Sequence, residues 1–165
     1  MSAEPSGFLQ SLIDPRLVFT GLDAPTLEEA LAELARRIAA AGVVHDAADL
    51  TRRLLERERL GCTGLGGGIA IPHCKLKEVD ELILLVASFP RGVNFLAPDG
   101  IPVTLVFLIL SPAHAPALHL QALARISRLL KGPGVADSLR SASTPEQLVG
   151  ALREAESAAV PAGRS

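Results

Sequence analysis

The chain has 165 residues, of which 48% are hydrophobic, and its formal net charge is −2. This size and composition predict a folded domain with a substantial core and exclude a disordered chain. The small net charge and the absence of tryptophan and tyrosine argue against a nucleic-acid partner, which basic patches and stacking aromatic side chains would bind.

No part of the sequence predicts export or insertion in a membrane. The longest largely apolar run, residues 101–110, is too short to cross a bilayer. The N-terminal residues 1–8 lack the basic and apolar regions of a signal peptide. Two cysteines in a chain of this length do not form a disulfide scaffold. We therefore expect a cytoplasmic protein.

Two helices are predicted in the first part of the chain. The first begins at a capping box formed by Thr26 and Glu29, carries apolar residues at helical spacing, and ends at Gly42. The second begins between residues 46 and 49 and ends at Gly61.

The middle of the chain predicts strands. A short strand covers residues 68–71, and two long apolar strands cover residues 82–89 and 101–110. Between the long strands lie a possible short strand over residues 93–95 and a turn at residues 98–100. The sequence therefore predicts that the two long strands pair antiparallel, and not a strict β-α-β alternation.

Helices return in the last third of the chain. One spans about residues 114–131, and its apolar stripe, extended back by one turn, includes His119. A short helix is expected within residues 131–141, and a final helix begins at the cap Thr144.

Together these elements predict a single layered α/β domain over residues 8–156, with helices on both sides of a mixed sheet. Residues 1–7 and 157–165 are polar, small or contain proline and glycine, so we expect flexible tails there. No internal repeat or linker divides the chain.

The stretch GCTGLGGGIAIPHCKL, residues 61–76, combines five glycines with a Pro-His pair. Such a backbone allows a ligand or a partner to approach closely. It does not match the phosphate-binding fingerprints, because no glycine precedes Lys75 and position 69 is an isoleucine where a dinucleotide fingerprint requires glycine. We therefore expect no nucleotide cofactor.

A metal site or a catalytic thiol also fits this stretch poorly. The available ligands are Cys62, His73, Cys74 and His119. Neighbouring residues of an extended chain face opposite sides, so His73 and Cys74 cannot easily share one ion or act as a nucleophile pair. There is no C-x-x-C pair, and a buried structural thiol is the simpler interpretation of Cys62. We expect no metal and no other cofactor.

His73 remains as a group that acts by itself. Pro72 restricts the backbone, so the preceding strand presents the imidazole with little freedom. A neutral imidazole is a nucleophile near pH 7 and can accept and release a phosphoryl group. Arg57 can stabilise phosphate oxygens, Thr63 adds a hydroxyl, and His119 can hydrogen-bond the first imidazole or the phosphate. The alternative for each histidine is an ordinary core residue.

The run ERERLGCTGLGGGIAIPHCKL, residues 56–76, closely resembles the active-site signature of a known family. That family is the enzyme IIA domains of the mannitol/fructose class in the bacterial phosphoenolpyruvate:sugar phosphotransferase system. The matching residues are Arg57, Glu58, Gly61, Thr63, Gly64, Gly66 and the unbroken Ile69-Ala70-Ile71-Pro72-His73. A second run, HLQAL at residues 119–123, is similar to the family's His-Leu-x-x-Leu signature. The resemblance covers residues 9–154 and is closest to the nitrogen-regulatory branch.

The resemblance implies a single α/β domain with a mixed, mostly five-stranded sheet. It also implies that His73 accepts a phosphoryl group at Nε2 from a small HPr-like phosphocarrier protein, and that His119 and Arg57 support the phosphohistidine. The phosphorylation state of the nitrogen-regulatory members controls other proteins, such as potassium transport components and kinases. The alternatives are a sugar-transport component that passes the phosphoryl group to a fructose- or mannitol-type IIB protein, and a sensory domain whose histidine no longer turns over.

Three positions depart from the commoner members of the family, and all are small replacements. They are Cys62, Gly67 and Cys74, where serine, a polar residue and glycine are frequent. The two cysteines leave redox sensitivity open. We expect a partner to dock on apolar surface around the glycine-rich stretch. Leu65 and Ile69 are the candidates, and the alternative for each is a core residue.

Overall fold

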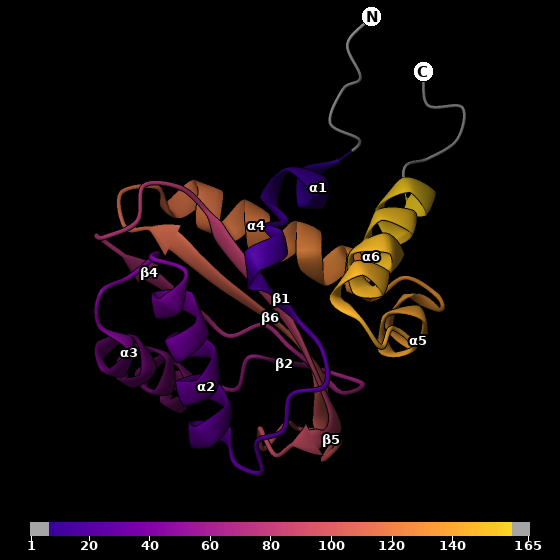
Figure 1. The fold of residues 1–165 in the computed structure, drawn as a ribbon, viewed down its shortest axis with the longest axis horizontal. Coiled ribbons are helices and arrows are strands. Elements are labelled where there is room, and N and C mark those ends of the chain that lie inside the picture. Colours follow the sequence, from indigo (N-terminus) through magenta and orange to yellow (C-terminus); the bar gives the residue numbers. More distant parts are fainter. Residues whose placement is uncertain (1–6, 160–165) are drawn as a thin grey trace, which may run out of the picture.

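The computed structural model describes residues 7–159, and its centre is a six-stranded mixed sheet (Figure 1). The strands are β1 (Val18–Phe19), β2 (Gly64–Gly66), β3 (Ile69–Ala70), β4 (His73–Leu76), β5 (Ile83–Val93) and β6 (Val103–Pro112). The helices are α1 (Phe8–Leu12), α2 (Leu27–Ala40), α3 (Ala47–Leu60), α4 (Pro116–Leu130), α5 (Val135–Arg140) and α6 (Pro145–Ala159). The predicted α/β class is confirmed, and the sheet has one strand more than the resemblance implied.

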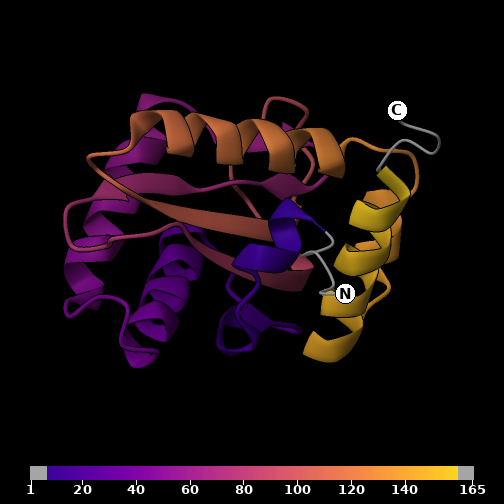
Figure 2. The ribbon, with the colours of Figure 1, turned by 90° about the horizontal axis from the view of Figure 1, so that it is seen from above.

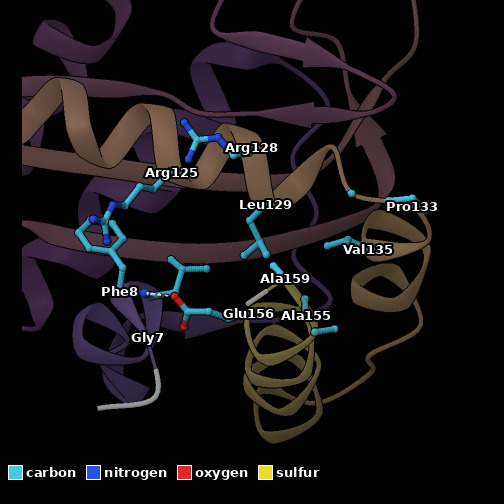
Figure 3. A pocket seen from close by; sticks show the side chains of 13 residues that line it. Gly7, Phe8, Arg125, Arg128, Leu129, Pro133, Val135, Ala155, Glu156 and Ala159 are labelled. Atoms are coloured by element: carbon cyan, nitrogen blue, oxygen red, sulfur yellow. Dashed lines mark hydrogen bonds between the residues drawn. The ribbon is translucent and has the colours of Figure 1, made fainter. Parts of the chain in front are cut away.

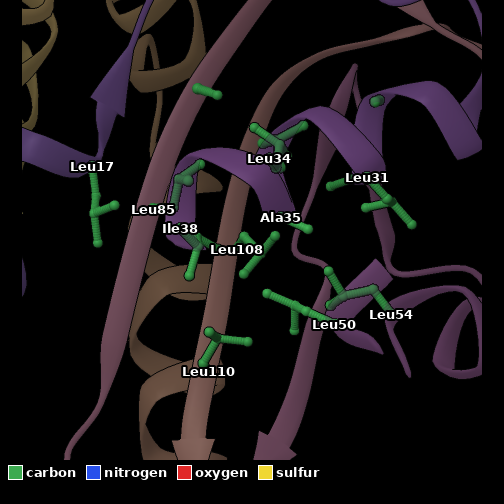
Figure 4. Close-up of a cluster of buried hydrophobic side chains, with 14 of the residues drawn as sticks. Leu17, Leu31, Leu34, Ala35, Ile38, Leu50, Leu54, Leu85, Leu108 and Leu110 are labelled. Atoms are coloured by element: carbon green, nitrogen blue, oxygen red, sulfur yellow. The ribbon is translucent and has the colours of Figure 1, made fainter. Parts of the chain in front are cut away.

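Helices α2 and α3 cover one face of the sheet, and α4 lies on the opposite face (Figure 2). Successive residues of β6 point to opposite faces of the sheet. Alternate apolar residues of the strand therefore pack into two different cores, one on each face. Val106, Leu108 and Leu110 pack against α2 and α3. Figure 4 shows side chains of α2 and α3 converging on Leu108 and Leu110.

The two long strands form the predicted antiparallel pair, with Leu85 opposite Leu108. The separate short strand expected over residues 93–95 is not formed. Instead, β5 itself continues to Val93, which pairs with Val103 of β6. None of the helices in the described part of the chain is long and apolar enough to cross a membrane.

The helix ends follow the predicted capping residues. The Oγ1 atom of Thr26 accepts the backbone N–H of Glu29 at 3.1 Å, which confirms the capping box. Asp46 caps α3 in the same way, and α3 ends at Gly61 as predicted. α6 continues to Ala159, three residues into the predicted C-terminal tail. Residues 1–6 and 160–165 of the predicted tails lie outside the described residues.

The strand that leads to His73 is interrupted once. β3 and β4 both pair in parallel with β6, and Pro72 lies between them. Proline has no N–H to donate to a sheet, but its carbonyl still accepts the N–H of Ile109 at 2.9 Å. The break therefore leaves β6 continuous and places His73, the first residue of β4, directly beside Ile109.

Candidate functional site

The side chain of His73 is held by its own backbone neighbourhood. Its Nδ1 atom lies 2.7 Å from the carbonyl oxygen of Ile71. A carbonyl oxygen can only accept, so Nδ1 carries the ring proton and Nε2 keeps its lone pair. The nitrogen available as a nucleophile is therefore Nε2, the atom that the sequence resemblance implies.

Arg57 belongs to the last turn of α3, and its guanidinium contacts Nε2 of His73. Its Nε is 3.2 Å from Nε2 of His73, and its Nη1 donates to the carbonyl oxygen of Gly61 at 3.0 Å. Burial lowers the pKa of His73, and the positive charges of Arg57 and Lys75 lower it further, against the opposing effect of the Ile71 carbonyl. The imidazole is therefore neutral and nucleophilic at neutral pH.

His119, on α4, is only 4% exposed and lies beside the first histidine. The two ring centroids are 5.1 Å apart with an angle of 57° between the rings. Burial lowers the pKa of His119 to about 4, and nearby positive charge at His73, Lys75 and Arg57 adds to the effect. The structure thus brings together the three predicted residues His73, His119 and Arg57.

Thr63 has a different environment from the one expected. Its hydroxyl donates to the Glu58 carboxylate, and its N–H donates to the second carboxylate oxygen at 3.1 Å. Its carbonyl accepts the N–H of Ile71 at 3.0 Å. The hydroxyl is therefore occupied by Glu58, and Thr63 links the end of α3 to the segment that holds His73.

Three of the five glycines form a tight turn away from His73, whereas Gly61 lies beside Arg57. Residues 66–68 have φ angles of 89°, 65° and 83°, in the left-handed region that favours glycine. They close the hairpin between β2 and β3. Asp99 accepts the Gly67 N–H at 2.8 Å, and Arg140 donates to the Gly67 carbonyl. These contacts hold the turn at the far end of the segment from His73.

Sequence reasoning missed two polar residues of this site. Lys75 lies two residues after His73 on β4, so strand alternation places it on the same face, and this signal was available. Ser111, on β6, lies 2.6 Å from Nδ1 of His119 through its Oγ atom. Its place opposite Lys75 depends on the register of β4 against β6, which no local pattern specifies.

A cavity of about 650 Å³ lies elsewhere, between α1, α4 and α6 (Figure 3). Two of its polar side chains, Glu156 and Arg125, hold the helices together. The Glu156 carboxylate accepts the backbone N–H groups of Leu9 and Gln10, and the Arg125 guanidinium stacks 4.9 Å from the Phe8 ring centroid. The cavity contains no residue of the histidine pair and offers no comparable chemistry.

Comparison with known proteins identifies the family. Residues 11–155 match the model of the family described as "Phosphoenolpyruvate-dependent sugar phosphotransferase system, EIIA 2". The chain belongs to this family. The predicted resemblance is therefore confirmed, and His73, Arg57 and His119 lie within the matched part of a IIA domain.

Relatives of this IIA domain carry both regulatory and sugar-transport names. It is 38% identical over 144 residues to a nitrogen regulatory protein of Bradyrhizobium diazoefficiens, covering 87% of this chain and 94% of that protein. This chain is also 34% identical over 145 residues to the fructose-specific EIIA component of Haloferax volcanii, and the match covers 87% of this chain and 94% of that protein.

Solved structures agree with this assignment. The nitrogen regulatory protein IIA-Ntr of Neisseria meningitidis has a TM-score of 0.79 at 27% identity, covering 88% of this chain and 97% of that chain. The mannitol IIA of Escherichia coli, in a complex with phosphorylated mannitol IIB, has a TM-score of 0.73 at 23% identity, covering 86% and 97%. The second likeness shows the fold alone.

The cysteines of this IIA domain face away from the histidine chemistry. Cys74 packs into the core beneath α2 and α3, and burial raises the pKa of its thiol to about 12. Such a thiol stays protonated at neutral pH and is a poor nucleophile. The Cys62 Sγ accepts the N–H of Gly64 at 3.2 Å and lies 3.4 Å from the Phe95 carbonyl oxygen. Within residues 7–159, no group of three metal-ligating side chains is found.

The lowered pKa of His119 predicts a pH-dependent stability. In the unfolded chain this histidine returns to its ordinary pKa of 6.5, whereas in the folded IIA domain its pKa is about 4. Between these values the unfolded state binds more protons, so stability is complete above pH 6.5 and falls as the pH drops towards 4. We expect a loss of about 3 kcal/mol over this window, measured by urea unfolding. His119→Gln should flatten the profile, whereas His45→Gln, at an exposed position, should leave its slope unchanged.

Proposed function

We propose that this protein is a cytoplasmic phosphocarrier that accepts a phosphoryl group on Nε2 of His73 from an HPr-like carrier protein. The observation that supports this most directly is the state of the His73 ring. Its Nδ1 proton is committed to the Ile71 carbonyl, so Nε2 is unprotonated, and its lone pair accepts the Nε–H of Arg57. Membership of the IIA family points to the same chemistry.

The proposed transfer is a direct exchange between two histidines. The Nε2 lone pair of His73 attacks phosphorus while the P–N bond to the carrier's histidine breaks, and that bond's electron pair returns to the donor nitrogen. The Nδ1 proton of His73 stays in place, so the Ile71 carbonyl stabilises the positive charge that develops on the ring. Arg57 moves from Nε2 to the phosphoryl oxygens, whose negative charge its guanidinium can bind in a bidentate manner.

A regulatory role is the favoured form of this function. The relative at 38% identity is named a nitrogen regulatory protein, and the match covers 94% of that relative. The phosphorylation state of His73 would then control target proteins, such as potassium transport components or kinases. The second candidate, a sugar-transport component that passes the group to a IIB protein, is supported by the fructose-specific relative at 34% identity.

The test is reconstitution with phosphoenolpyruvate, enzyme I and the cognate HPr-like carrier, followed by intact mass at neutral pH. We expect one phosphoryl adduct that is lost in acid, because a phosphoramidate hydrolyses when it is protonated. No adduct would contradict the proposal, and an acid-stable adduct would indicate serine or threonine instead. Adding IIB, IIC and sugar then separates the two forms, since only the transport form loses its phosphoryl group to sugar.

The two candidates for the partner surface, Leu65 and Ile69, are largely buried. Ile69 is a core residue at 5% exposure, and Leu65 is half-buried against the core. Two exposed leucines adjoin site residues in the chain, Leu60 and Leu120, at 84% and 66%. Leu60 precedes Gly61, which Arg57 contacts, and Leu120 follows His119. We propose that these two leucines contact the carrier protein.

Replacing either leucine by glutamate should therefore weaken docking. Loss of one well-packed apolar contact is expected to raise the KM for the carrier about tenfold, with kcat nearly unchanged. Ile101→Glu is the control, since Ile101 is 47% exposed but lies before β6, at the opposite end from Ile109 and His73. Equal KM values for all three variants would argue against this surface.

A further inference from the structure

Ser111 is a polar residue on an otherwise apolar face of the sheet. Alternate residues of β6 share a face, and Leu105, Phe107 and Ile109 all pack in the core beneath α4. Ser111 continues that series at the end of the strand and is fully buried. Its side chain therefore meets α4 at the point where His119 enters the site.

The Ser111 hydroxyl has one partner in the described part of the chain. Its Oγ lies 2.6 Å from Nδ1 of His119, and no other hydrogen bond of this hydroxyl is found among residues 7–159. Two arrangements are possible in principle. Either the imidazole donates from Nδ1 to the hydroxyl oxygen, or the hydroxyl donates to an unprotonated Nδ1.

The first arrangement leaves the hydroxyl proton without an acceptor in a fully buried position. An unpaired buried polar group is costly, whereas a hydroxyl that donates to Nδ1 satisfies both groups at once. Nδ1 of His119 is then unprotonated, and in the neutral ring the proton must be on Nε2.

The Nε2 atom of His119 is free to use that proton. It has no hydrogen-bond partner within residues 7–159, and it is not sealed from solvent, because the only unpartnered buried side-chain polar atom described is Nε2 of Gln10. The His73 ring centroid is 5.1 Å away. An oxygen of a group attached to His73 would therefore find a donor in this N–H.

We propose that Ser111 is a positioning residue that fixes His119 as the Nε2–H tautomer, so that this N–H donates to the phosphoryl group on His73. This inference rests on the proposed function. The two histidines then hold opposite tautomers, each set by one oxygen atom. The Ile71 carbonyl leaves the lone pair of His73 on Nε2, and the Ser111 hydroxyl places the proton of His119 on Nε2. A lone pair in place of that proton would repel the phosphoryl oxygens.

The tautomers can be read directly from the unphosphorylated protein. Imidazole ¹⁵N chemical shifts at neutral pH should show His73 protonated at Nδ1 and His119 protonated at Nε2. Ser111→Ala should give His119 intermediate shifts, because neither ring nitrogen retains a fixed partner, while Ser111→Thr keeps the hydroxyl and the pure tautomer. A wild-type His119 protonated at Nδ1 would overturn the inference, whatever the protein's function.

Transfer kinetics provide the second readout. At saturating carrier concentration, Ser111→Ala should slow phosphorylation of His73 about tenfold, since the loss of a charge-assisted hydrogen bond is of that size, with no change in KM for the carrier. The matched control is Ser88→Ala, which removes another buried serine hydroxyl, on β5, where it accepts the Gly21 N–H. Equal rates for the two alanine variants would overturn the role of Ser111. Failure of the wild type to become phosphorylated would instead contradict the proposed function and leave the tautomer result standing.

Discussion

The variant His73→Gln is expected to show no phosphoryl adduct under conditions in which the wild-type protein gains one. Glutamine keeps a polar side chain of similar reach but has no basic nitrogen that can attack phosphorus. The fold should survive, because His73 is only half-buried at the start of an edge strand. Intact mass at neutral pH measures the adduct, and circular dichroism with thermal unfolding checks the fold.

The chain offers two matched controls among its four histidines. His45 and His114 are both exposed and lie outside the site, so His45→Gln and His114→Gln should accept the phosphoryl group at the wild-type rate. An adduct that persists in His73→Gln would assign the chemistry to another residue. His119 is the nearest such candidate, and peptide mapping at neutral pH would decide.

The second large effect is expected at Arg57. Arg57→Gln should slow phosphoryl transfer about 100-fold, the usual cost of removing one preorganised group that stabilises charge in a transition state. Its Nε contacts Nε2 of His73 while its Nη1 binds the Gly61 carbonyl, so a fork of donors is needed. Arg57→Lys should therefore recover little of the rate. Single-turnover transfer from the phosphorylated carrier measures this step.

The charge of Arg57 provides an independent check. This charge lowers the pKa of His73, so Arg57→Gln should raise that pKa in an NMR titration. Arg59→Gln, on the same turn of α3 but exposed, should change neither the rate nor the pKa. An unchanged rate in Arg57→Gln would show that the guanidinium holds the Gly61 carbonyl without assisting the transfer.

Local patterns in the sequence were sufficient for much of the fold and for the three residues that the candidate site brings together. Apolar periodicity and caps located the long helices, and the Pro-His pair at the end of a short strand singled out His73. The helical stripe of α4 placed His119 inward, and the helix that ends at Gly61 placed Arg57 one turn before the glycines. These features depend on residues close together in the chain, which explains why they could be predicted.

Features that depend on strand register or on distant contacts could not be predicted. The pairing of β4 with β6 decides that Ser111 lies within reach of His119, and nothing in the local sequence specifies it. The partner of Thr63 was missed because Glu58 reaches it only after the chain turns at Gly61. The short strands β1, β2 and β4 have too few residues to show a period of two.

The interruption at Pro72 has a consequence for signalling. The backbone on either side of His73 remains bonded to β6 through the Pro72 carbonyl and the β4 pairing, so an added phosphoryl group has no loose loop to rearrange. The two forms of the protein should therefore share one backbone and differ chiefly in local electrostatic potential. A target that distinguishes them would have to sense that potential, and its preference for one form should weaken as ionic strength rises.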